Sequence, residues 1–244
     1  LNVFDVSDPT ALRPTGVVTL YGGAMAVAAD AGRAYVADSV GGLRVFDPLA
    51  AGGPAELGAL EGVLLEHLAA AGPLVFGVEA GGGLLVVDAA DPTHMSILGS
   101  LDVETQALCA VSYDLGRNRV YVADVGTLDV EHLGELGEDL LEVDVSDPAS
   151  PKRARTISLT VGTQAAYPRD IRVAGGRAFV ASGTLGWRFG AHGFGLFVAP
   201  LDGDPSVPAV WRVPMPDAAL GVDVVAGRAL VAAGDAGLLV VDPR

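Results

Sequence analysis

A short apolar pattern recurs along the chain at nearly even spacing. Each copy begins with leucine, continues with apolar residues and ends with aspartate: Leu1-Asn-Val-Phe-Asp5, Leu43-Arg-Val-Phe-Asp47, Leu84-Leu-Val-Val-Asp88, Leu140-Leu-Glu-Val-Asp144 and Leu238-Leu-Val-Val-Asp242, with a degenerate copy at Leu196-Phe-Val-Ala-Pro200. Successive leucines are 42, 41, 56, 56 and 42 residues apart. A fixed period of about 40 residues is typical of repeat folds. The pattern therefore predicts units that begin near residues 1, 43, 84, 140, 196 and 238.

Other apolar strands keep register with the leucine strands. One precedes each of them, as in residues 33–37 and 177–181, and a further stretch lies upstream across a Gly-containing turn, which is typical of a hairpin. An Asp-Pro turn and a fourth strand follow, as in residues 16–20 and 157–161. The best helical candidate, residues 61–71, is short. Four short strands per period predict an all-β fold, a β-propeller of four-stranded antiparallel blades.

The number of strands does not fit a closed ring of five blades. Five repeats are visible and one leucine strand is left over. We expect a single propeller domain over residues 1–244 with five to six blades, or seven if the chain is truncated.

These motifs resemble those of the LVIVD-repeat propellers. The resemblance is carried by the leucine strands, by the Val-Ser-Asp-Pro turns at residues 6–9 and 145–148, and by hairpins such as Arg33-Ala-Tyr-Val-Ala37. It covers nearly the whole chain and implies a propeller fold. It also implies a bacterial or archaeal protein that is secreted or lies at the cell surface, in a family without assigned chemistry.

Composition and charge argue against nucleic-acid binding, a disulfide within the chain and a membrane-spanning segment. The chain has 30 acidic and 15 basic residues, a net charge of −15, so it repels phosphate backbones and we expect no nucleic-acid partner. Cys109 is the only cysteine, which excludes a disulfide within the chain. No apolar run reaches the roughly 18 residues of a membrane span, so we expect no transmembrane segment.

Catalytic motifs are absent from the sequence. It contains no Gly-x-Ser-x-Gly elbow, no His-Glu-x-x-His zinc motif and no phosphate-binding loop. The aspartates that close the leucine strands are predicted to build turns, because they recur in every complete copy. Asp202 and Asp204 are compatible with calcium, but they occupy the place of an Asp-Pro turn, which favours capping. We therefore expect no cofactor, with calcium as the alternative.

Two long repeats break the regular pattern with insertions at the same place, residues 124–139 and 182–195. Adjacent repeats make adjacent blades, so we expect both insertions on one rim. The first is acidic and the second is aromatic and basic, which suits a binding surface. The candidate partner-binding residues are Asp129, Glu131, His132, Glu135, Trp187, Arg188, Phe189, His192 and Phe194.

The sequence favours a non-enzymatic interaction or structural module of an extracytoplasmic protein, secreted, periplasmic or at the cell surface. Its partner would be another protein or other chains of a surface assembly. Three alternatives remain: the insertions pack only on each other, they form a metal site around His132 and His192, or the chain is a metal-dependent hydrolase or lactonase-like propeller with a site on the same face. Asp170 and Asp223 are the main carboxylates that the inner strands offer such an enzyme.

Overall fold

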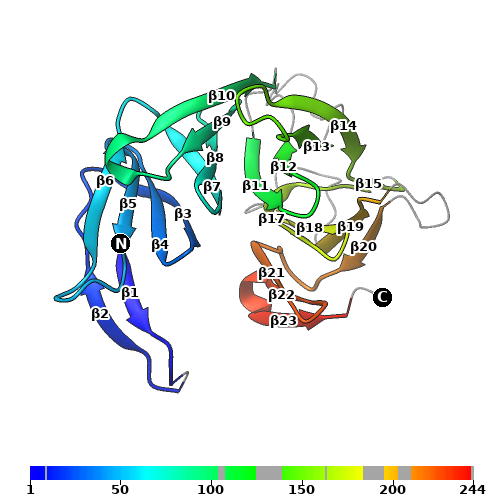
Figure 1. The fold of residues 1–244 in the computed structure, drawn as a ribbon. Helices are drawn as coiled ribbons and strands as arrows, with labels where there is room; N and C mark the ends of the chain where they lie inside the picture. The colour runs from blue at the N-terminus through cyan, green and yellow to red at the C-terminus, as the bar shows by residue number, and fades with distance from the viewer. Residues whose placement is uncertain are drawn as a thin grey trace. The chain divides into compact units, whose positions relative to one another are not determined.

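The chain is built almost entirely of β-strands (Figure 1). The computed structural model describes residues 1–8, 10–103, 108–124, 139–162, 164–183, 195–202 and 210–242. In these ranges the helical elements are two short 3-10 turns, η1 (Pro92–His94) and η2 (Gly234–Ala236), and no helix is long and apolar enough to cross a membrane. The chain divides into two compact units, unit 1 (Leu1–Ala80 and Leu84–Leu101) and unit 2 (Gly81–Gly83 and Asp102–Arg244).

Unit 1 contains two four-stranded antiparallel sheets and a hairpin. The first blade consists of β3 (Ala24–Asp30), β4 (Arg33–Asp38), β5 (Gly42–Asp47) and β6 (Ala55–Leu60). The second blade consists of β7 (Leu65–Ala71), β8 (Leu74–Glu79), β9 (Gly83–Asp88) and β10 (Ser96–Asp102). The hairpin pairs β1 (Asn2–Asp5) with β2 (Arg13–Val17).

Unit 2 contains the third, fourth and fifth blades. The third consists of β11 (Leu108–Asp114), β12 (Arg119–Asp124), β13 (Asp139–Asp144) and β14 (Lys152–Ser158), followed by the short pair β15 (Thr160–Val161) and β16 (Gln164–Ala165). The fourth consists of β17 (Pro168–Ala174), β18 (Arg177–Ser182), β19 (Gly195–Pro200) and β20 (Trp211–Pro214). The fifth has three strands, β21 (Gly221–Val225), β22 (Arg228–Ala232) and β23 (Leu238–Val241).

The predicted fold class is confirmed. The leucine strands are the third strands β5, β9, β13, β19 and β23, and the degenerate copy forms β19 like the others. The extra leucine strand is β1, which forms its own two-stranded sheet with β2.

Two details concern individual elements. The best helical candidate, residues 61–71, contains the strand β7, whose backbone pairs with β8, in agreement with the predicted all-β fold. The fourth strands begin earlier than residues 16 and 157, since β2 starts at Arg13 and β14 at Lys152. In each pair the register shifts within the preceding leucine strand, between Val3 and Phe4 in β1 and between Glu142 and Val143 in β13.

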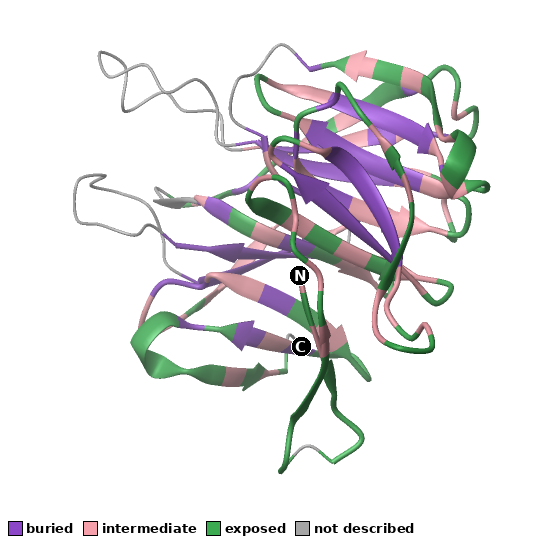
Figure 2. Ribbon diagram, turned by 90° about the vertical axis from the view of Figure 1, so that its left-hand side faces the viewer, coloured by how far each residue is buried: buried purple, intermediate pink, exposed green. Residues whose placement is uncertain are grey.

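The three larger apolar cores lie between neighbouring blades, because one sheet cannot bury both of its faces alone. In unit 1 the core between the first two blades includes Tyr35, Leu43, Leu65, Val75 and Val87. In unit 2 one cluster joins the third and fourth blades and another joins the fourth and fifth. In the first four blades the second and third strands are therefore buried along most of their length, and purple segments mark buried residues in Figure 2.

The repeat aspartates hold turns, as the sequence predicts. Each of those that end β1, β5, β9 and β13 accepts the backbone N–H two residues further on at 2.9 Å: Asp5, Asp47, Asp88 and Asp144. The aspartates of the following Asp-Pro turns do the same at 2.9–3.1 Å: Asp8, Asp91 and Asp147. Hydrogen bonds to Thr93 and His94 lower the pKa of Asp91 to about 2.

Candidate functional site

The two insertions leave the blades at one defined end. We call the end where the second strand stops and the third begins the insertion end, and the opposite end, where the first and second strands join, the hairpin end. The nine partner-binding residues predicted from the sequence lie at 125–138 and 184–194, outside the described residues. The structure describes the strands from which both insertions start, which we call the roots.

The root of the first insertion is a pair of opposed carboxylates. Strands β12 and β13 stay paired up to Asp124 and Asp139, which face each other across the ladder. Asp124 is 9% exposed. Burial and the neighbouring Asp124 charge raise the pKa of Asp139, against a smaller opposite effect of Arg153. Like charges directly opposite each other destabilise a sheet, so this root carries an electrostatic cost that the fold itself does not require.

The root of the second insertion is held by hydrogen bonds and close packing. The buried Ser182 Oγ accepts the Tyr167 N–H at 2.8 Å, and the Gly183 N–H donates to the Tyr167 carbonyl at 3.1 Å. The Ala219 N–H donates to the Ser182 carbonyl at 3.2 Å. A Cβ at Gly183 would lie 2.6 Å from the Cβ of Ala218. Glycine is needed here because the segment that enters the fifth blade passes so close.

The two roots lie on neighbouring blades, as the order of the repeats predicts. First strands β11 and β17 lie side by side. The Val173 N–H donates to Ser112 Oγ at 3.1 Å between them, and Ser112 is 7% exposed. The insertions therefore start from the same end of two blades that share one core.

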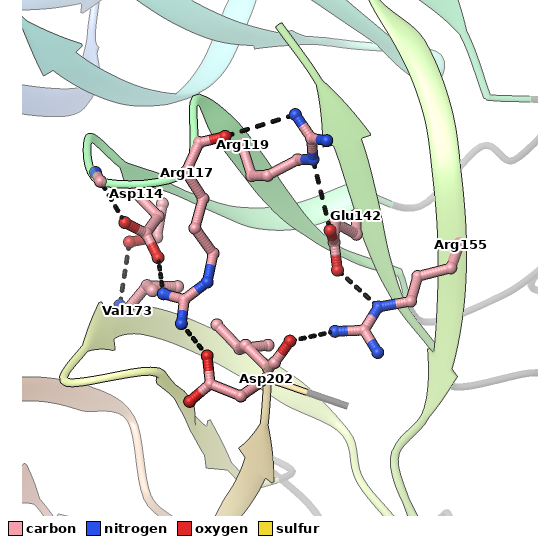
Figure 3. Close-up of polar contacts among 10 residues, drawn as sticks. Asp114, Arg117, Arg119, Glu142, Arg155, Val173 and Asp202 are labelled. Atoms are coloured by element: carbon pink, nitrogen blue, oxygen red, sulfur yellow. Dashed lines mark hydrogen bonds and ion pairs between the residues drawn. The ribbon is translucent and has the colours of Figure 1, made fainter. Parts of the chain in front are cut away.

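The hairpin end of the same two blades is cross-linked by charged groups (Figure 3). Arg117 binds Asp114 at 2.6 Å within the third blade and Asp202 in the fourth. Arg155 binds Glu142 at 2.6 Å and donates to the Leu201 carbonyl at 2.7 Å. These contacts connect third-blade side chains to the turn after β19, so this end is fixed structurally.

Asp202 is therefore engaged in an ion pair with Arg117. Asp204 lies outside the described residues. Within the described ranges no group of three or more His, Cys, Asp or Glu residues suits a metal ion. The calcium alternative at Asp202 and Asp204 stays a prediction, because Asp204 lies outside the described residues.

The two inner-strand carboxylates are already engaged. Asp170 accepts the N–H groups of Ile171 at 2.8 Å and Val222 at 3.0 Å, and Asp223 accepts that of Val224 at 2.9 Å. The Arg172 guanidinium lies between them, 3.7 Å from Asp170 and 3.6 Å from Asp223. Both carboxylates thus contribute to joining β17 and β21.

Among the described histidines, His94 is exposed at the hairpin end. Its ring nitrogen Nδ1 lies 2.9 Å from Asp91. His67 lies in β7 of the second blade. The histidines of the predicted metal site, His132 and His192, lie outside the described residues.

Comparison with known families supports the repeat assignment. Residues 76–103 and 135–156 match the family model of the LVIVD repeat. Each matched stretch includes a leucine strand, its turn-holding aspartate and a fourth strand. No curated protein matches the chain.

Sequence reasoning missed the charged network at the hairpin end. One signal was present: Glu142 interrupts the apolar leucine strand at a position that is valine in β5 and β9. A charge in a largely buried strand requires a partner of opposite charge. The partner Arg155 lies in the fourth strand, which the repeat pattern did not place in register.

Proposed function

We propose that the chain is a non-enzymatic interaction module of an extracytoplasmic protein and binds a protein partner through the rim formed by its two insertions. The observation that carries the proposal is the position of the roots. Both insertions start from the insertion end of neighbouring blades, and the strands beneath them stay fully paired. The blades thus complete their ladders without the insertions, which makes the extra residues available for binding.

The location outside the cytoplasm is part of the same proposal. The resemblance to LVIVD-repeat propellers of secreted and surface proteins supports it, and so does the presence of one cysteine in 244 residues. The net charge of −15 argues for a protein partner over nucleic acid.

The decisive experiment removes the insertions without changing the ladders. The first blade supplies the template, because Asp38 and Gly42 pair across a three-residue turn, Ser39-Val40-Gly41, at the position of both insertions. Residues 125–138 are replaced by Ser-Val-Gly, and residues 184–194 are replaced by Val-Gly so that Gly183 is kept, singly and together. A surface fraction of the source cells provides the partner, which is then purified for binding measurements.

Loss of partner binding with a nearly unchanged melting temperature is the expected result. Full binding by the double replacement, together with a large loss of thermal stability, would mean that the insertions are structural. A single replacement that alone removes binding would identify the contacting loop. The second candidate, a metal-dependent hydrolase, would be favoured by one tightly held metal ion per chain in elemental analysis, lost in the double replacement.

A further inference from the structure

Unit 1 exposes large apolar side chains at the insertion end of its blades. Tyr21 is 77% exposed, Val40 74%, Met25 50% and Leu64 46%. Tyr21 lies just before β3, Met25 lies in β3, Val40 lies in the β4–β5 turn, and Leu64 lies just before β7. We call these four residues the unit 1 patch. Exposed apolar groups that gather at one end of a domain mark a binding surface more often than scattered ones do.

The two most exposed members are fixed by one buried carboxylate. Asp38 is 1% exposed and accepts the Tyr21 N–H at 2.9 Å and the Val40 N–H at 3.1 Å. Burial opposes its charge, but the hydrogen bonds from Val40 and its neighbours outweigh burial and lower the Asp38 pKa. Tyr21 and Val40 are therefore held next to each other while their side chains remain exposed.

The Tyr21 ring is further oriented by a cation. The Arg44 guanidinium lies 4.5 Å from the ring centroid and is itself buried, with Glu56 as its ion-pair partner. One face of the ring is thus supported from below. An aromatic side chain that is ordered before binding loses little conformational entropy when a partner covers it.

Backbone bulges place two further side chains at this end. The β3–β4 ladder shifts register between Ala24 and Ala26, and the β7–β8 ladder shifts between Leu65 and His67. The extra residues are Met25 and Glu66, respectively. Bulges re-aim side chains and are frequent beside binding sites. The shift recurs at the same register in the third and fourth blades, so the geometry is repeated while the side chain changes.

The charge around the unit 1 patch is negative. Glu61, Glu66 and Glu79 lie at the insertion end of the second blade. Residues 1–101 contain three arginines and no lysine. Arg13 is opposite Asp5 in the β1–β2 hairpin, Arg33 donates to the Ala89 carbonyl at the hairpin end, and Arg44 is buried beneath Tyr21. Arg13 and Arg33 thus lie away from the exposed patch, and the charge of Arg44 is paired with Glu56.

We propose that the unit 1 patch binds a partner segment that combines apolar side chains with lysine or arginine. Tyr21, Val40, Met25 and Leu64 supply the apolar contact, and the three glutamates select positive charge. The patch and the insertions consist of different residues, so variants of one leave the other unchanged and the two failures are distinguishable.

The test uses the full chain and defined peptides. The probe is a fluorescent peptide of about 12 residues composed of lysine and leucine, compared with a lysine–serine and a glutamate–leucine peptide of equal length. Binding is measured by fluorescence anisotropy at about 0.05 M and about 0.3 M salt. The variants are Met25→Ser with Val40→Ser, and Glu61→Gln with Glu66→Gln. Leu49→Ser is the matched control, since Leu49 is 80% exposed in unit 1 but lies at the hairpin end.

We expect the lysine–leucine peptide to bind and both analogues to bind at least about fivefold more weakly. The serine variant should weaken binding about fivefold or more, the glutamine variant should reduce the salt dependence, and the control should stay within about twofold. If the lysine–serine peptide bound as tightly as the lysine–leucine peptide, net charge alone would explain the binding, and the proposal would be overturned. An unchanged affinity in the serine variant, or no binding to the wild type, would overturn it as well.

Discussion

The buried hydroxyl group of Tyr121 destabilises the folded chain, and the substitution Tyr121→Phe should remove this destabilisation. Tyr121 lies in the middle of β12, is fully buried and belongs to the core between the third and fourth blades. Among the described residues its hydroxyl has no hydrogen-bond partner. The equivalent positions in the second and fourth blades are Phe76 and Phe179, which shows that a phenyl ring fits this site of the repeat.

The magnitude follows from the missing partner. A buried hydroxyl without a hydrogen bond costs about 1–3 kcal/mol. Tyr121→Phe removes the group and leaves a small void, so we expect a net gain of about 1 kcal/mol. For a domain of this size that corresponds to a rise in melting temperature of about 2–4 °C.

Alkaline pH gives a second, independent readout. Burial, and next the charge of Glu142, raise the pKa of Tyr121 from 10.0 to about 12. Below pH 10 the hydroxyl is neutral in both the folded and the unfolded chain. Between pH 10 and 12 the unfolded chain loses this proton first, so the wild type loses stability as pH rises. The phenylalanine variant should lack this part of the loss.

The assay is thermal unfolding followed by circular dichroism at pH 7 and across pH 9–12. Tyr113→Phe is the control, because the Tyr113 hydroxyl donates to Asn118 at 3.0 Å and its removal should cost up to about 1 kcal/mol. Phe179→Tyr should lower stability by about 1–3 kcal/mol. A loss of stability in Tyr121→Phe equal to that in Tyr113→Phe would refute the reasoning, since the hydroxyl would then have a partner.

Three further substitutions test the turns and the roots. Asp139→Asn should stabilise the chain by about 0.2–1 kcal/mol at pH 7 by removing the charge opposite Asp124, and the gain should vanish as pH falls below 3.8, where the carboxyl is protonated in both states; an equal gain at both pH values in thermal melts would contradict this. Ala31→Asn should add about 0.5–1 kcal/mol in urea unfolding, because Ala31 has φ 49° in a tight hairpin turn that favours asparagine, and a loss would disprove the assigned turn. Gly183→Ala should cost about 1–3 kcal/mol, because its Cβ would lie 2.7 Å from the Cα of Ala218; an unchanged melting temperature would show that the root can move.

The architecture of the blades was readable from the sequence because it repeats. Every blade packs in the same way, so the same residue types return at the same spacing. The leucine strands, the hairpins and the turns held by Asp5, Asp47, Asp88 and Asp144 were placed correctly. The degenerate copy at Leu196–Pro200 was recognised by its spacing and forms a third strand like the others. The stretch Leu65–Ala71 forms the strand β7, and its type was ambiguous in the sequence because a short apolar stretch fits a helix or a strand.

The positions of the insertions were also predictable, since they break the repeat between Asp124 and Asp139 and between Ser182 and Gly195. The tertiary structure decided how these positions are held. Ser182 binds Tyr167, Ser112 binds Val173, and these partners lie 15 and 61 residues apart in the sequence.

The tertiary structure also decided which charged groups meet and which apolar side chains are exposed. The sequence shows that Tyr21, Val40 and Asp38 are present, but nothing in their spacing brings two backbone N–H groups to one buried carboxylate. The bulge that inserts Met25 depends on the pairing of β3 with β4, and pairing is a property of two strands together. Local sequence determines which strands and turns form, because both depend on near neighbours. Only the packed blades decide which polar groups meet and which apolar side chains remain exposed, because these depend on residues distant in the chain.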